Sequence, residues 1–164
     1  MFTEQLLRRA ADLIALCRAK NLKAATAESC TGGLLAGLLT EIPGASAVVE
    51  RGFVVYSNEA KRELLGVGAD ILRDHGAVSA EAARAMAAGA LGNSRADITL
   101  AITGVAGPDG GTPQKPIGLV HFALADRRNE SAAIERRYGD LGRSAIRLAA
   151  LATALDLLEA AARD

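Results

Sequence analysis

Residues 22–33 read Leu22-Lys-Ala-Ala-Thr-Ala-Glu-Ser-Cys-Thr-Gly-Gly33 and join a short apolar run to a longer helical pattern. Residues 22–27 are short and strand-like, and the spacing after them predicts a helix over residues 29–42 that ends before Pro43. A strand that leads directly into a helix is the building unit of layered α/β proteins. This junction therefore predicts an α/β fold, and it makes the end of the strand a candidate position for catalytic residues.

Helical and strand-like patterns alternate on both sides of this junction, and two adjacent strands follow near the end. Such an order predicts a layered α/β protein with a mixed sheet. The expected elements are a helix over 3–20 capped by Thr3, a buried strand over 47–56, a short helix capped by Asn58 and ending near Gly66, an Ala-rich helix over 79–91, a strand over 96–103, two strands over 117–125 and 131–138 joined by a hairpin link at 126–129, and a helix over 142–162.

Composition narrows the class of protein. The chain has 164 residues, which favours one domain over residues 1–164 and allows a core without disulfide bonds. Aromatic residues make up 3% and Trp is absent, which argues against a binder that stacks single-stranded bases. Lys plus Arg and Asp plus Glu both number 19, so the net charge does not favour nucleic acid or an anionic membrane as a partner. The two cysteines, Cys17 and Cys30, do not have metal-site spacing.

The N-terminal residues lack the basic-then-apolar order of a signal peptide. Apolar runs also stay well below the ~18 residues of a membrane span. We therefore expect a cytoplasmic location and no membrane partner.

Ser29 has two interpretations. It can be a simple N-cap, or its hydroxyl can attack a carbonyl while backbone N–H groups of residues 30–33 stabilise the oxyanion. The two glycines cost roughly 1 kcal/mol each near a helix start, and they allow a ligand to approach the backbone. The expected substrate-contacting residues of this turn are Cys30, Thr31, Gly32 and Gly33.

Cys30 is the alternative nucleophile, although a free Cys is more often a small buried apolar residue. A Cys-His or Ser-His pair would need His75 or His121, the two histidines of the chain, and neither lies in a convincing loop motif. These observations favour a base other than histidine.

Lys61 lies near the start of the short helix, where its charge opposes the helix dipole. It can be a solvated surface residue, or a desolvated base whose pKa falls toward neutrality. Tyr56, at the end of the preceding strand, can orient or relay the proton, or can lie at the sheet edge with its hydroxyl in water.

Residues 103–118 are rich in Gly and Pro and predict a long loop without regular structure. Loops of this length are often functional, although this one can also be a long turn between strands. It is not a Walker loop, because no Gly-Lys-Ser/Thr precedes a helix. Its candidate ligand-binding residues are Thr103, Gly104, Gly110, Gly111 and Lys115.

Arg143 and Arg147 are four residues apart at the start of the last helix, so they share a face. Two such guanidinium groups can bind a phosphate, or can form a solvated helix face. Glu28 is a possible structural partner of either cation.

Together these segments resemble the C-terminal domain family of the competence/damage-inducible protein CinA, from the first strand to the last helix. Their joint order and spacing carry the resemblance. The matching segments are Ala27-Glu-Ser-Cys-Thr-Gly-Gly33, Val55-Tyr-Ser-Asn58 with Lys61 and Leu65-Gly-Val67, Gly76-Ala-Val-Ser79, Thr103-Gly-Val-Ala-Gly-Pro108 with Gly110-Gly-Thr112 and Lys115-Pro-Ile-Gly118, and Gly142-Arg143 with Arg147.

The resemblance implies a three-layer α/β/α sandwich, often oligomeric, so we expect a homo-oligomer. It implies a nicotinamide-nucleotide amidohydrolase of pyridine-nucleotide salvage, which converts nicotinamide mononucleotide and water into nicotinate mononucleotide and ammonia. It also implies a Ser-Lys mechanism with Ser29, Tyr56 and Lys61 at the matching positions, with no metal and no cofactor. The alternative is a nucleotide-sensing module without chemistry in a competence or DNA-damage response.

Overall fold

The computed structural model describes residues 2–127 and 129–164. Its five-stranded sheet has the order β2-β1-β3-β4-β5. Strand β1 pairs in parallel with both β2 and β3, whereas β4 is antiparallel to β3 and β5. The mixed sheet expected from the sequence is therefore confirmed. The strands are β1 (Ala24–Glu28), β2 (Val49–Val54), β3 (Ile98–Gly104), β4 (Leu119–Asp126) and β5 (Asn129–Arg137).

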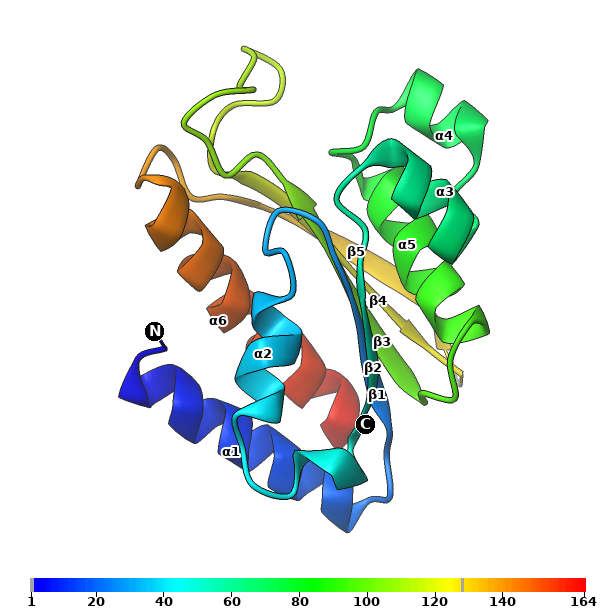
Figure 1. Ribbon diagram of the computed structural model, residues 1–164, viewed down its shortest axis with the longest axis vertical. Coiled ribbons are helices and arrows are strands. Elements are labelled where there is room, and N and C mark those ends of the chain that lie inside the picture. Colours follow the sequence, from blue (N-terminus) through cyan, green and yellow to red (C-terminus); the bar gives the residue numbers. More distant parts are fainter. Residues whose placement is uncertain (1, 128) are drawn as a thin grey trace.

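Helices cover both faces of this sheet, which confirms the three-layer α/β/α sandwich. Helices α1, α2 and α6 lie on one side, and α3, α4 and α5 lie on the other (Figure 1). The helices are α1 (Glu4–Ala19), α2 (Leu34–Thr40), α3 (Asn58–Leu65), α4 (Ala69–Asp74), α5 (Ala80–Gly92) and α6 (Arg143–Arg163), with a 3-10 turn at Ala45–Ala47.

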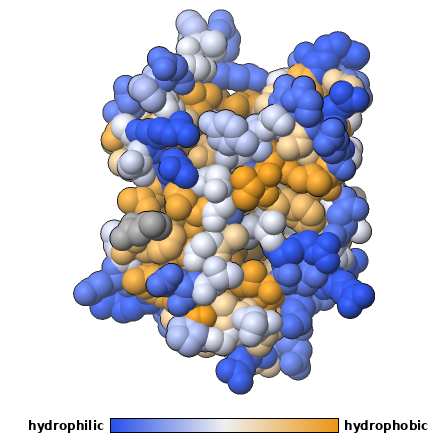
Figure 2. Space-filling model, viewed as in Figure 1, coloured by the Kyte–Doolittle hydropathy of each residue, from blue (hydrophilic) through white to orange (hydrophobic). Residues whose placement is uncertain are grey.

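Each helical layer forms its own apolar core against the sheet. The α1–α2–α6 layer packs leucines and isoleucines such as Leu38 and Leu151, whereas the α5 layer packs small residues such as Ala83 and Ala87. All five residues of β1 are buried, because this strand has neighbours on both edges and helices on both faces. In the space-filling view, apolar residues gather in the middle of the face and hydrophilic residues occupy its margins (Figure 2). None of the helices within the described residues is long and apolar enough to cross a membrane.

Capping residues and glycines in the sequence correctly predicted most of the ends of the helices and strands. Thr3 caps α1 by accepting a hydrogen bond from the Leu6 N–H at 3.2 Å, and Gly66 ends α3 in the left-handed conformation. The cap of α3 is Ser57 rather than Asn58, since the Ser57 hydroxyl accepts from the Ala60 N–H. Helix α4 is an element that the sequence analysis did not predict.

Two further predictions were wrong. The strand expected to be buried, β2, lies at the sheet edge and is partly exposed, because among the described residues β1 is the one strand that pairs with it. The helix expected from Ser29 starts five residues later, at Leu34, because Gly32 and Gly33 both take positive φ angles, of 60° and 92°. The hairpin link expected at 126–129 includes residue 128, which lies outside the described residues.

Candidate active site

Ser29 and Lys61 meet at the end of the sheet where β1 stops. Ser29 directly follows β1, and Lys61 lies in α3 on the opposite side of the sheet from α2 (Figure 1). The Lys61 Nζ atom donates a hydrogen bond to the Ser29 Oγ atom at 3.1 Å, and both side chains are buried. A base in hydrogen-bond contact with a hydroxyl is the arrangement that activates a nucleophile.

Lys61 is held by the backbone of the segment before α3. Its side chain is only 1% exposed, and its Nζ also donates to the carbonyls of Val55 at 2.9 Å and Tyr56 at 3.1 Å. Burial lowers the pKa of the Lys61 amine from its ordinary value of 10.5, because desolvation disfavours the charged form. The pKa shift therefore favours the neutral amine, which is the form that accepts a proton.

Residues 29–33, here called the Ser29 turn, separate β1 from α2. The Ser29 N–H donates to the Ile102 carbonyl on β3 at 2.9 Å, and the Gly32 N–H donates to the Ser29 carbonyl at 3.0 Å. The backbone of Ser29 is thereby anchored through both of its polar groups. The turn replaces the first turn of the expected helix.

Glu28 was a possible partner of Arg143 or Arg147 by sequence, and it has a different role in the structure. Its side chain is fully buried, and its carboxylate accepts the N–H groups of Gly33 at 3.1 Å, Leu35 at 3.0 Å and Ala36 at 2.8 Å. Glu28 thus binds the N-terminus of α2 rather than an arginine of α6. The available signal was an acidic residue close before a helix start, where unpaired N–H groups and the helix dipole favour an anion.

The hydrogen bonds of the turn reduce the number of donors for an oxyanion. Gly32 donates to Ser29 and Gly33 donates to Glu28, so two of the four expected N–H groups are occupied. Within residues 2–127 and 129–164, the N–H groups of Cys30 and Thr31 have no hydrogen bond to another residue. These two groups are the remaining backbone donors beside the nucleophile.

The Cys30 thiol is buried, and burial raises its pKa to about 12. A thiol with so high a pKa has almost no thiolate at neutral pH, and thiolate is the reactive form. The structure therefore disfavours Cys30 as the nucleophile.

Ser29 and Lys61 line a cavity of about 260 Å³. Eight of the expected site residues line it: Ser29, Cys30, Tyr56, Lys61, Thr103, Gly104, Gly110 and Arg143. Asp109 and Val78 also line it, and the sequence analysis did not single them out. Six expected residues lie outside its lining: Thr31, Gly32, Gly33, Gly111, Lys115 and Arg147.

Tyr56 and Arg143 lie together at the mouth of this cavity. The Tyr56 side chain is 63% exposed, and the Arg143 guanidinium approaches its hydroxyl at 3.5 Å. Arg143 also donates to the Gly107 carbonyl at 2.8 Å, which ties α6 to the 103–118 loop. Thr103 is buried deeper, with its hydroxyl donating to the Ala77 carbonyl at 2.8 Å.

The two histidines line a different cavity. His75 and His121 lie with Lys115 in a pocket of about 260 Å³ near the start of α5. The Lys115 amine donates to the carbonyl of His75 instead of reaching the Ser29 cavity. Neither histidine is therefore placed to act as a base for Ser29 or Cys30.

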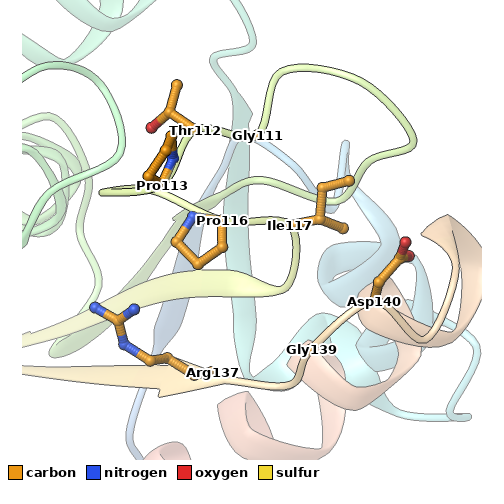
Figure 3. A pocket seen from close by; sticks show the side chains of 8 residues that line it. All are labelled: Gly111, Thr112, Pro113, Pro116, Ile117, Arg137, Gly139 and Asp140. Carbon is orange, nitrogen blue, oxygen red and sulfur yellow. The ribbon is translucent and has the colours of Figure 1, made fainter.

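A larger, open hollow of about 540 Å³ lies beside the 103–118 loop (Figure 3). Its walls include Pro113, Pro116 and Ile117, together with the charged residues Arg137 and Asp140. It lacks a paired nucleophile and base, so the smaller Ser29 cavity is the better candidate site. In the part of the chain that the structure describes, no group of three or more His, Cys, Asp or Glu residues could hold a metal ion.

A model of the CinA C-terminal domain matches residues 7–162. The chain belongs to the CinA C-terminal domain family. A CinA-like protein of Geobacter sulfurreducens is 52% identical over 143 residues, which are 87% of this chain and 34% of that protein. The chain thus spans about a third of the length of such CinA-like relatives.

Solved CinA-family structures share the whole fold. The crystal structure of a competence/damage inducible protein from Agrobacterium tumefaciens is 52% identical, has a TM-score of 0.96, and is matched over 98% of this chain and 97% of its own. A CinA superfamily protein from Escherichia coli is 31% identical with a TM-score of 0.89, over 96% of this chain and 92% of its own. The family resemblance and the three-layer fold are therefore confirmed.

Proposed function

We propose that this protein is an amidohydrolase that converts nicotinamide mononucleotide and water into nicotinate mononucleotide and ammonia. The observation that supports it best is the 3.1 Å contact between the Lys61 amine and the Ser29 hydroxyl inside a cavity. The choice of nicotinamide mononucleotide rests on the resemblance of the motifs to nicotinamide-nucleotide amidohydrolases.

In the proposed reaction, neutral Lys61 takes the proton of the Ser29 hydroxyl as its Oγ atom attacks the carboxamide carbon. The N–H group of Cys30, which lines the cavity, stabilises the negative oxygen of the tetrahedral intermediate. Lys61 then gives its proton to the departing nitrogen, ammonia leaves, and an acyl-enzyme ester remains on Ser29. Lys61 next takes a proton from water, which attacks the ester. Lys61 then returns this proton to the departing Ser29 Oγ atom, which releases nicotinate mononucleotide and restores the Ser29 hydroxyl.

The cavity mouth supplies groups for the rest of the nucleotide. Arg143 offers a guanidinium for the phosphate, and the loop around Gly107 and Gly110 offers backbone groups for the ribose. Tyr56 contacts this end of the ligand through its exposed ring and hydroxyl. Arg143 therefore replaces the Arg143–Arg147 pair as the proposed phosphate ligand. The homo-oligomer expected from the resemblance remains a proposal, which light scattering on the purified protein tests.

The deciding experiment measures ammonia release from nicotinamide mononucleotide by the wild type and by Ser29→Ala and Lys61→Ala. We expect each variant to lose at least about a thousandfold in kcat, as nucleophile and base variants of hydrolases do. Lys23→Ala is a matched control, because the exposed Lys23 amine also donates to a backbone carbonyl, that of Ala47, at 2.7 Å. Full turnover by Ser29→Ala would contradict the nucleophile assignment. Calorimetric binding by the wild type without ammonia release would favour the nucleotide-sensing alternative.

A further inference from the structure

Arg143 and Arg147 share a helix face but make different contacts. Arg143 lines the Ser29 cavity, whereas Arg147 lies outside its lining. The Arg147 guanidinium instead donates a hydrogen bond to the carbonyl of Thr31 at 2.9 Å. Arg147 therefore contacts the Ser29 turn from α6, outside the lining of the Ser29 cavity.

This contact is transmitted to Ser29 by a single peptide group. The Thr31 carbonyl and the Gly32 N–H belong to the same planar peptide, so holding one orients the other. The Gly32 N–H is the group that donates to the Ser29 carbonyl at 3.0 Å. Since the Ser29 N–H is bound to β3, the nucleophile is anchored to the sheet on one side and, through Arg147, to α6 on the other.

The Arg147 side chain packs closely against the Ser29 turn. Its Nε atom is buried and lacks a hydrogen-bond partner among the described residues. A Cβ atom added at Gly32 would lie 3.5 Å from the guanidinium, so the cation packs directly on the turn. The Thr31 side chain beside it is fully buried. These contacts leave the turn little freedom to move while Arg147 is in place.

We infer that Arg147 is a positioning residue, which holds the Ser29 turn so that the Ser29 hydroxyl stays within reach of Lys61 and the substrate carbon. This inference rests on the proposed function of Ser29 as the nucleophile. It assigns Arg147 no contact with substrate, in contrast to Arg143.

The test compares the wild type with Arg147→Met and Arg147→Lys. For Arg147→Met we expect kcat to fall about tenfold to a hundredfold, because small misplacements of reacting groups have effects of this size, while KM stays within about twofold. Arg147→Lys retains one donor and the charge, so it should recover most of the lost kcat. Arg9→Met is the matched control, since Arg9 also donates to a backbone carbonyl of α6, that of Ala152, at 3.2 Å, but does not touch the Ser29 turn.

Crystal structures of the same proteins provide a readout that does not depend on activity. In Arg147→Met, the hydrogen bond between Lys61 Nζ and Ser29 Oγ should lengthen beyond 3.5 Å, and in Arg147→Lys it should be restored. An unchanged Ser29 turn in Arg147→Met, or a raised KM with unchanged kcat, would overturn the inference. If Arg147→Met does not fold, Arg147→Lys with wild-type geometry and kcat supports the inference, and a displaced turn with wild-type kcat overturns it. Absence of ammonia release by the wild type would refute the proposed function, while the crystal structures would still decide the role of Arg147.

Discussion

The Nζ atom of Lys61 and the Oγ atom of Ser29 lie 3.1 Å apart, although 32 residues separate them in the chain. They approach because β1 ends beside the segment that leads from β2 into α3, and β1 and β2 are parallel neighbours. The carbonyls of Val55 and Tyr56 hold the amine from the other side. The pair thus depends on the strand order of the sheet as much as on the two side chains.

The pH dependence of the reaction should report on Lys61. Burial lowers the pKa of its amine below 10.5, and only the neutral amine accepts the Ser29 proton. The value of kcat/KM should therefore rise with pH, with its acid-side midpoint below 10.5. Ammonia release measured from pH 5 to 10 provides the check. A rate that falls over this range in the folded enzyme would show that Lys61 acts in its charged form.

Replacing Cys30 should leave the reaction largely intact. Its thiol is buried with a pKa raised to about 12, so it contributes little thiolate. We expect Cys30→Ala to keep kcat within about threefold, and the folded wild type to react slowly with thiol reagents at this position. Cys17→Ala, which changes the other buried cysteine, is the control. A loss as large as that of Ser29→Ala would restore Cys30 as the nucleophile.

Glu28 should be important for stability and for the shape of the Ser29 turn. Its carboxylate accepts three N–H groups at the start of α2, and Gln offers one oxygen and an NH₂ group that cannot accept. Glu28→Gln should lower the free energy of unfolding by about 1.5–3 kcal/mol, the range for hydrogen bonds to a charged group. Urea unfolding measures this difference, with the exposed Glu41→Gln as a control. Equal stability of the two variants would mean that the buried carboxylate is not needed.

Arg143 should act on substrate affinity through the phosphate. It lies at the cavity mouth, beside Tyr56 and Gly107. Arg143→Met should raise KM for nicotinamide mononucleotide about tenfold or more, since a charge-assisted contact contributes roughly 1.5–3 kcal/mol. The same change should have little effect on nicotinamide riboside, which lacks the phosphate. Equal effects on both substrates would place Arg143 at the reacting carboxamide or in the scaffold.

Short-range interactions explain what was predictable. The cap Thr3 and the glycine stop at Gly66 act within one turn of chain, so the helix ends they mark follow from nearby residues. The start of α2 was mispredicted because Gly32 and Gly33 take positive φ angles, which delay the helix until Leu34. The edge position of β2 was also not predictable, because apolar content does not specify which strands become neighbours.

The sequence by itself determined the α/β class, the family and the candidate side chains for the proposed chemistry, since periodicity and motif spacing are properties of the chain. Only the tertiary structure decided that Lys61 is buried against Ser29, that both histidines lie elsewhere, and that the two arginines of α6 have separate contacts. These outcomes depend on strand order and on helix packing across the sheet. Both join residues far apart in the chain, through desolvation and hydrogen bonds that local sequence does not encode.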